Sequence, residues 1–111
     1  MVSGGWVTQA DRSRWQQRAA SELAAILAAH PDLPVLAWTV TASGGALSGQ
    51  VLAAAGRRGL FGQWLQALGL DEVTETASGN GTPVYLHARG VRGGVAVSVT
   101  ATVFDDGEDS R

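Results

Sequence analysis

The sequence predicts a single α+β domain in which two helices pack on an antiparallel sheet of about five strands. Apolar residues recur at helical spacing in two segments, 9–29 and 56–68. Between and after these segments they alternate with polar residues, as in strands. The 111 residues are enough for one domain but few for two. The order is helix, strand, strand, helix and three strands, without a repeat or a linker, which favours one sheet with helices packed on it.

The first helix is expected over residues 9–29. Thr8 and Asp11 match a helix start, where a hydroxyl accepts hydrogen bonds from free backbone N–H groups. The helix should end at His30, because the residue before Pro31 avoids the helical conformation. Its apolar stripe is Trp15, Ala19, Leu23, Ile26 and Leu27.

Two strands should follow, over residues 33–41 and about 46–53, joined by a tight turn at residues 43–45. One face of the first strand carries Leu36, Trp38 and Val40, and the other carries Val35, Ala37 and Thr39. Because both faces are largely apolar, we expect this strand in the centre of the sheet, covered on both sides.

The second helix is expected over residues 56–68. Gly69 suits the left-handed position after a helix, and Leu70 could then pack back on Leu65. Gly59 and Gly62 weaken the first turns but leave a smooth surface on which a neighbour could pack closely. Its apolar stripe is Leu60, Phe61, Trp64, Leu65 and Leu68.

Three strands are expected in the last third of the chain, over residues 73–77, 82–89 and 95–103. The pair Asn80 and Gly81 is a strong hairpin signal, and residues 90–94 should form the next turn. The strand over 73–77, with its Thr and Glu side chains, is expected at an edge of the sheet.

The two ends of the chain are expected to lie outside the domain, which covers residues 9–104. Residues 1–8 should be loose, and residues 105–111 should form an acidic disordered tail. The net charge of −2 is unevenly distributed. Residues 1–70 contain five arginines and three carboxylates, whereas residues 71–111 contain three arginines and seven carboxylates.

Composition excludes several classes of site. No cysteine is present, so no disulfide can form, and a zinc site could use only histidines and carboxylates. The two histidines, His30 and His87, are too few for a His-rich metal site. We expect no cofactor. Without an 18-residue apolar stretch or a secretory signal pattern, a cytoplasmic protein is expected.

The histidines are also the main candidates for catalysis. His30 should serve as a cap at the helix end, where it can hydrogen-bond the last carbonyls. His87 shares a strand face with Tyr85 and Arg89, and Glu75 on the neighbouring strand could be its carboxylate partner. We interpret both histidines as capping or surface groups. No Gly-x-Ser-x-Gly motif is present, so we do not expect an enzyme.

Basic residues offer a nucleic-acid alternative. Arg57 and Arg58, between Gly56 and Gly59 at a helix start, could hold a phosphate, and these four residues resemble the GXXG loop of KH domains. Arg12, Arg14 and Arg18 lie on the first helix and could add phosphate contacts. We favour an ordinary turn and a solvated helix face, because the chain is acidic overall.

The element order over residues 9–104 is similar to that of Roadblock/LC7 domains. The resemblance implies a small adaptor that dimerises and scaffolds GTPase systems. The segments LPVLAWTVTASGGALSGQV and FGQWLQALGL, and the stretch starting TPVYLHARG, also resemble small uncharacterised proteins of high-GC Gram-positive bacteria, some encoded near mobile elements. The absence of lysine alongside eight arginines fits a GC-rich genome.

The sequence therefore predicts a non-catalytic protein-interaction or regulatory module that forms a homodimer. The alternatives are a nucleic-acid-binding accessory protein of a mobile element, and a small ligand-binding domain or enzyme with a pocket between sheet and helix. The surface for a partner or ligand would include Trp38, Tyr85, His87, Arg89, Gly59 and Gly62. No membrane contact is expected.

Overall fold

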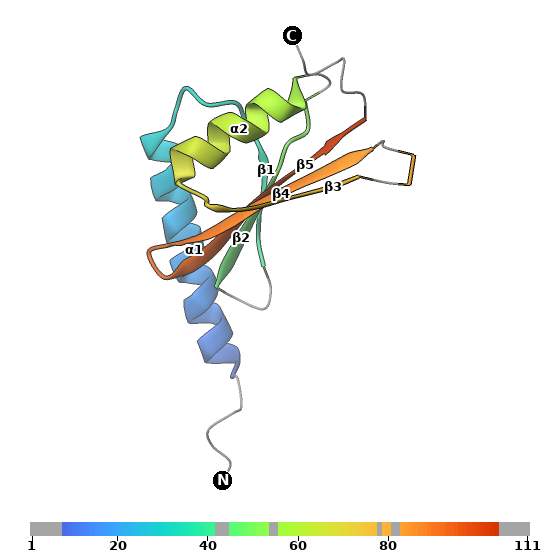
Figure 1. Ribbon diagram of the computed structural model, residues 1–111. Coiled ribbons are helices and arrows are strands. Elements are labelled where there is room, and N and C mark those ends of the chain that lie inside the picture. The colour runs from blue at the N-terminus through green and yellow to red at the C-terminus, as the bar shows by residue number, and fades with distance from the viewer. Residues whose placement is uncertain (1–7, 42–44, 54–55, 78, 81–82, 105–111) are drawn as a thin grey trace.

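The structure, a computed structural model, describes residues 8–41, 45–53, 56–77, 79–80 and 83–104. Within these ranges the chain forms two helices and five strands in the predicted order (Figure 1). The elements are α1 (Gln9–Ala29), β1 (Ala37–Val40), β2 (Ala46–Gln50), α2 (Arg57–Leu68), β3 (Glu72–Ala77), β4 (Val84–Arg92) and β5 (Val95–Val103). The α+β class is confirmed. The acidic tail and, apart from Thr8, the loose N-terminal segment lie outside the described residues.

The sheet is mixed, not wholly antiparallel as predicted. Its strand order is β1-β2-β5-β4-β3, and β2 and β5 run parallel while the other three neighbouring pairs are antiparallel. The parallel pair arises because α2 carries the chain from β2 to the far edge of the sheet. The meander β3-β4-β5 then returns to β2, and its last strand arrives in the same direction as β2.

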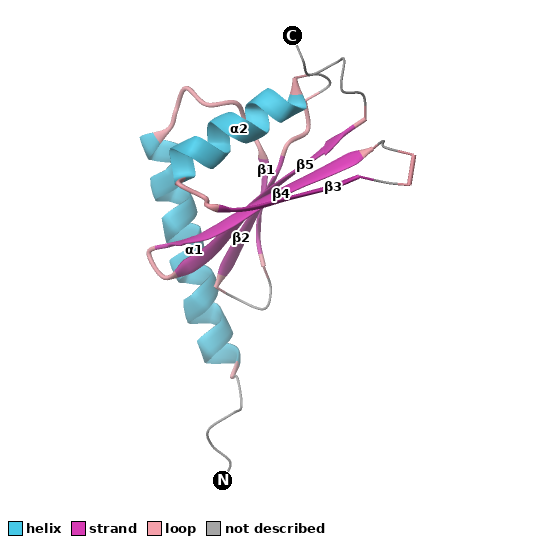
Figure 2. Ribbon diagram, viewed as in Figure 1, coloured by secondary structure: helices cyan, strands magenta, loops and turns pink. Residues whose placement is uncertain are grey.

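Both helices lie on the same side of the sheet (Figure 2). Alternate residues of β4 and β5 are buried, as expected for a sheet covered on one face. They join one hydrophobic core with Ala19 and Ile26 of α1 and Phe61, Trp64 and Leu68 of α2. No described helix covers the opposite face, which we call the open face.

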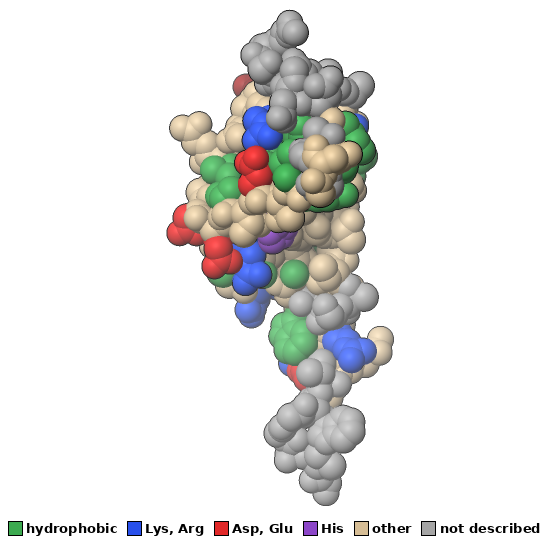
Figure 3. Space-filling view, turned by 45° about the vertical axis from the view of Figure 1, so that its right-hand side comes forward, with side chains coloured by type: hydrophobic (Ala, Val, Ile, Leu, Met, Phe, Trp, Pro, Cys, Tyr) green, Lys and Arg blue, Asp and Glu red, His purple; other side chains and the backbone are tan. Residues whose placement is uncertain are grey.

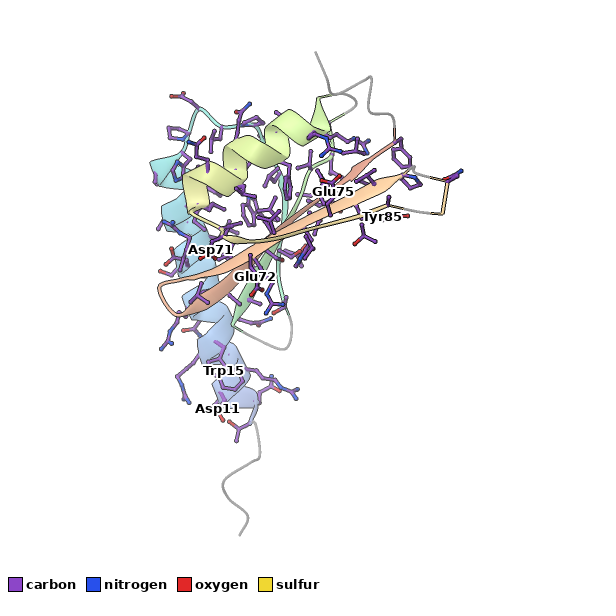
Figure 4. The ribbon with its side chains drawn as sticks, viewed as in Figure 1. Asp11, Trp15, Asp71, Glu72, Glu75 and Tyr85 are labelled. Atoms are coloured by element: carbon purple, nitrogen blue, oxygen red, sulfur yellow. The ribbon has the colours of Figure 1, made fainter. Side chains whose placement is uncertain are left out.

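The predicted bounds and N-cap of α1 are confirmed. Thr8 Oγ1 accepts a hydrogen bond from the Asp11 N–H at 3.0 Å, and the Asp11 carboxylate accepts one from the Thr8 N–H at 3.2 Å. The backbone hydrogen bond from Thr8 is the main reason that the pKa of Asp11 lies below its ordinary value. The predicted stripe is only partly buried. Trp15 lies on the first part of α1, which projects beyond the sheet (Figure 4), and Leu27 is 48% exposed.

The second helix also follows its prediction. Gly56 and Gly69, at its two ends, both adopt positive φ angles, of 73° and 67°. After Gly69 the chain turns so that the N–H of Leu70 donates to the Leu65 carbonyl at 3.1 Å, and the Leu70 side chain is buried. With the Gly69 N–H donating to the Gln66 carbonyl at 3.3 Å, this is a Schellman motif, with Gly69 in the left-handed conformation that its position predicts.

Two local predictions are wrong. β1 is an edge strand, not a central one, because β5 pairs with the other side of β2 and no described strand pairs with the free side of β1. Its second face is not covered either, since Val35, just before the strand, is 93% exposed. Residues 90–92 continue β4, and the turn consists of Gly93 and Gly94, which both have positive φ. Gly90 fits inside a strand because the side chain of Leu70 packs against it, where a Cβ would lie only 3.1 Å from Leu70 Cδ2.

Candidate interaction surfaces

The open face of the sheet carries mainly small polar side chains in rows that cross the strands. The pairing registers place two such rows side by side. One row is Thr39, Ser48, Ser98, Arg89 and Glu72, and the next is Ala37, Gln50, Thr100, His87 and Thr74. Apart from Gln50 of β2, the long side chains come from β4 and β3, so the face is lower over most of β2 and β5.

A hollow of about 480 Å³ lies on this face, where long and short side chains meet. Asp71, Glu72, His87, Arg89 and Ser98 contribute to its lining, and Figure 3 shows acidic, basic and histidine side chains gathered together there. Arg89 Nε lies 2.6 Å from Glu72 Oε1, so the guanidinium already has a carboxylate partner. The hollow is therefore a weak anion site as it stands.

The pairing expected between His87 and Glu75 does not form. His87 lies opposite Thr74 on the open face, whereas Glu75 lies opposite Leu86 on the helix-covered face. Tyr85 is half-exposed on the open face and is not part of the hollow's lining. Within the described ranges no three His, Asp or Glu residues cluster as metal ligands.

His30 caps α1 as predicted, but with its backbone. Its N–H donates to the Ile26 carbonyl at 3.1 Å, and its ring packs edge-on to Trp64 with centroids 6.2 Å apart. The described contacts therefore give His30 a structural role.

Arg57 is a structural clamp between α2 and β5. Its guanidinium donates to the carbonyls of Ala53 at 2.6 Å and Thr102 at 2.7 Å, and lies 5.4 Å from the centroid of the Phe104 ring. These contacts use two of its five N–H donors and one face of its guanidinium plane inside its own chain. An arginine held in this way is a poor candidate for a phosphate contact.

The other predicted basic residues do not form one surface with Arg57. Arg58 NH1 lies 3.2 Å from Glu75 Oε1, and Arg14 is paired with Asp11. Arg12 and Arg18 are exposed on α1. The starts of α1 and α2 lie at opposite ends of the molecule (Figure 1), so a nucleic-acid site built from all five arginines is not assembled.

Gly59 and Gly62 are exposed on α2, and a Cβ at either position would meet nothing within 4 Å. The smooth helix surface predicted from them is present. Trp38 is half-buried and packs edge-on to Trp64, with ring centroids 5.8 Å apart. The predicted partner surface is therefore divided among α2, the open face and the helix-covered side of β1.

The edge strand β3 is exposed at all six of its residues. Its two carboxylates are paired with arginines of the same chain, Glu72 with Arg89 and Glu75 with Arg58. The strand order confirms that β3 is an edge strand, as its Thr and Glu content predicts.

The sequence interpretation missed a groove between α1 and the edge of β1. Two hollows, of about 360 Å³ and about 230 Å³, follow this edge and include Val40 and Trp38 respectively. The signal in the sequence is a second stripe on α1, formed by Ser13, Ala20 and Leu27 at seven-residue intervals. We call the two hollows and the β1 edge between them the β1 groove.

No protein-family model matches this chain, and no curated protein matches it. Among the described residues, neither helix has the length and apolar character needed to cross a membrane.

Proposed function

We propose that this protein is a non-catalytic interaction module that works as a homodimer, with the β3 edges of two copies paired antiparallel. The observation that carries the proposal is the state of β3. This strand is an edge whose six residues are all exposed, so the backbone groups facing away from β4 are open to another strand.

The charge at this edge also supports pairing. Charged side chains usually protect an edge strand, because they would be brought together or desolvated in an edge-to-edge contact. Here Glu72 and Glu75 each have an arginine partner within 3.2 Å. These largely exposed ion pairs add little to stability. Their effect is to leave β3 without net negative charge.

Symmetry restricts the register of such a pair. A two-fold axis perpendicular to the sheet requires that residues opposite each other point to the same face. An axis at Thr74 satisfies this and places Thr74 opposite its own copy, Val73 opposite Glu75, and Glu72 opposite Thr76. An axis at Glu75 would place two carboxylates opposite each other, which is unfavourable. We therefore propose the register centred on Thr74.

The resemblance in element order to Roadblock/LC7 adaptors, which dimerise, points in the same direction. It favours a protein-binding role in the cytoplasm over catalysis.

The proposal is tested by light scattering of the native chain and by cross-linking of single-cysteine variants, since the chain has no cysteine. In the proposed register Thr74→Cys brings two Cα atoms to about 4.5–5.5 Å, within the range of a disulfide. Mild oxidation should link this variant to a dimer. Thr39→Cys, on the opposite edge and also exposed, is the matched control and should stay monomeric on a denaturing gel. A strict monomer in light scattering, or a dimer that Thr74→Cys does not link, would show that the proposal is wrong.

A further inference from the structure

β1 is an edge strand with the sequence pattern of a covered strand. One face carries Trp38 and Val40, the other carries Ala37 and Thr39, and Val35, just before the strand, is 93% exposed. Ala37 and Thr39 are also exposed. Apolar surface therefore lies directly beside unpaired backbone groups, a combination that strand-adding partners cover in other proteins.

The β1 groove continues this surface onto α1. Ser13, Ala20 and Leu27 recur every seven residues and so share one side of the helix. The smaller hollow lies between Leu27 and Trp38 and is lined mainly by leucine, proline and tryptophan side chains. The larger one lies between Val40 and a polar part of α1 formed by Ser13, Gln16 and Gln17.

The spacing of the two hollows matches an extended chain. Trp38 and Val40 are two residues apart and point to the same side of the sheet. A strand added beside β1 would place alternate side chains on that side with the same repeat. Two of its residues would then reach the two hollows, with an apolar side chain at Trp38 and a polar side chain at Val40.

The indole of Trp38, which lines the groove, favours a neutral segment that carries a hydrogen-bond acceptor. Trp38 Nε1 is buried without a hydrogen-bond partner among the described residues, whereas Trp64 Nε1 donates to the Pro34 carbonyl at 2.8 Å. An unpaired buried donor is costly, so an acceptor brought by a partner is favourable. At the other end of the groove the Thr41 carbonyl already accepts a hydrogen bond from Gln16 Nε2, so it does not require a donor from the partner. The described lining residues of both hollows include no Arg, Asp or Glu.

We propose that the β1 groove binds an extended, uncharged segment of a partner protein by strand addition to β1. The segment carries an apolar side chain in the hollow at Trp38 and an uncharged polar side chain two residues away in the hollow at Val40. This proposal rests on the function proposed above, an interaction module, and assigns the partner to the edge opposite the dimer contact.

The test starts from a displayed library of short random peptides selected against the native chain. The enriched sequences should share an apolar residue and an uncharged polar residue two positions apart. A synthetic peptide with the enriched sequence then serves as the probe in an NMR titration. Its effects should be largest at the amides of residues 37–40. A library without an enriched sequence, or a peptide whose effects map to β3 or the open face, would overturn the proposal.

The two tryptophan indoles provide an internal control in the same titration. The Trp38 indole N–H signal should move downfield on saturation, because it gains an acceptor. The Trp64 signal should stay in place, because its N–H is already bonded to Pro34. A Trp38→Phe variant assigns the signals by removing one of them. A bound peptide that leaves the Trp38 signal unmoved contradicts the proposed geometry.

Matched glutamate variants test the groove itself. Leu27 is 48% exposed in the groove, and Leu52 is 61% exposed outside its lining, so both tolerate a polar side chain. Leu27→Glu should weaken peptide binding by about tenfold or more, because it places a charge against an apolar side chain. Leu52→Glu should leave affinity unchanged. Equal effects of the two variants would exclude the groove as the site.

Self-association through β1 is distinguished by the cysteine variants. If oxidised Thr39→Cys forms a cross-linked dimer, a second copy occupies β1 and the partner segment is excluded. Thr74→Cys reports the β3 dimer separately. Failure of peptide binding and failure of the proposed dimer can therefore be told apart.

Discussion

The two edges of the sheet differ in how they are held. β1 has only four residues, but Trp38 and Val40 pack on the core, and Trp64 of α2 bonds to the carbonyl of Pro34 just before the strand. β3 has six residues, all exposed, and packs mainly on β4. The core therefore fixes the position of β1, whereas β3 is held mainly by its ladder of hydrogen bonds to β4. Changes near β1 should reduce the stability of the fold, and changes on β3 should alter association instead.

Removal of the Trp64 side chain should have the largest effect. Trp64 is 1% exposed, contacts the rings of Trp38 and His30, and donates to Pro34. Trp64→Ala should lower the free energy of unfolding by about 3–5 kcal/mol, through the cavity and the lost hydrogen bond. Urea denaturation followed by circular dichroism measures it. A loss comparable to that of an exposed substitution would mean that β1 is not anchored by the core.

Adding a methyl group at Gly49 of β2, against the side chain of Trp38 in β1, should have the next largest effect. A Cβ at Gly49 would lie 3.0 Å from both Trp38 Cζ3 and Leu36 Cδ1, so those side chains must shift. Gly49→Ala should therefore destabilise the protein by about 1–3 kcal/mol. Gly62→Ala is the matched control, since the same methyl group meets open space in a helix and should stabilise by about 0.5–1 kcal/mol. Equal thermal melting temperatures for the two variants would contradict this packing of β1.

The fold was largely predictable wherever local chemistry decides it. The bounds of α1 follow from Thr8, Asp11 and the His30-Pro31 pair, and the end of α2 follows from Gly69. The edge position of β1 was not predictable. The apolar pattern of a strand indicates which of its faces could be buried, but it does not show whether another strand pairs with each side of its backbone. The parallel pairing of β2 with β5 joins segments 50 residues apart, such as Ala46 and Ala96, and no local pattern encodes it.

The candidate surfaces show the same division. The edge position of β3 was visible in its own residues. The β1 groove was not, because it exists only where α1 lies beside β1. Arg57 and its glycine neighbours had the sequence pattern of a phosphate site. The Arg57 guanidinium instead donates to the Ala53 and Thr102 carbonyls, which only the folded chain brings within reach.

The start of α1, which forms one wall of the β1 groove, should respond to acid. The pKa of Asp11 is lowered chiefly by the hydrogen bond from the Thr8 N–H. Its contribution is therefore complete above the ordinary value of 3.8 and is lost as the pH falls through the lower value of the folded state. The protection of the amides of residues 9–16, measured as exchange relative to the intrinsic rate at each pH, should fall there, and Asp11→Asn should remove this pH dependence. At neutral pH, Thr8→Ala should destabilise this helix start by about 1 kcal/mol. Unchanged protection of these amides in acid would argue against the capping box.

A charge on β3 should have the smallest effect on stability. Thr74 is exposed, so Thr74→Lys should change the free energy of unfolding by less than about 0.5 kcal/mol. In the proposed dimer it places two ammonium groups opposite each other across the two-fold axis, and light scattering should show a monomer. Thr39→Lys on β1 is the control and should leave the dimer intact. A Thr74→Lys protein that stays dimeric would show that the dimer contact does not lie at β3.

The parallel pairing of β2 with β5 also bears on how the chain folds. Hairpins β1-β2 and β4-β5 are joined by short connections and can close early, whereas the β2–β5 contact must wait until 50 residues of chain have been brought together. Until that seam closes, β2 and β5 are both edges. We therefore expect the first 70 residues and the β3-β4-β5 meander to behave as two halves, so that a chain cut at Asp71 could reassemble from its separate pieces.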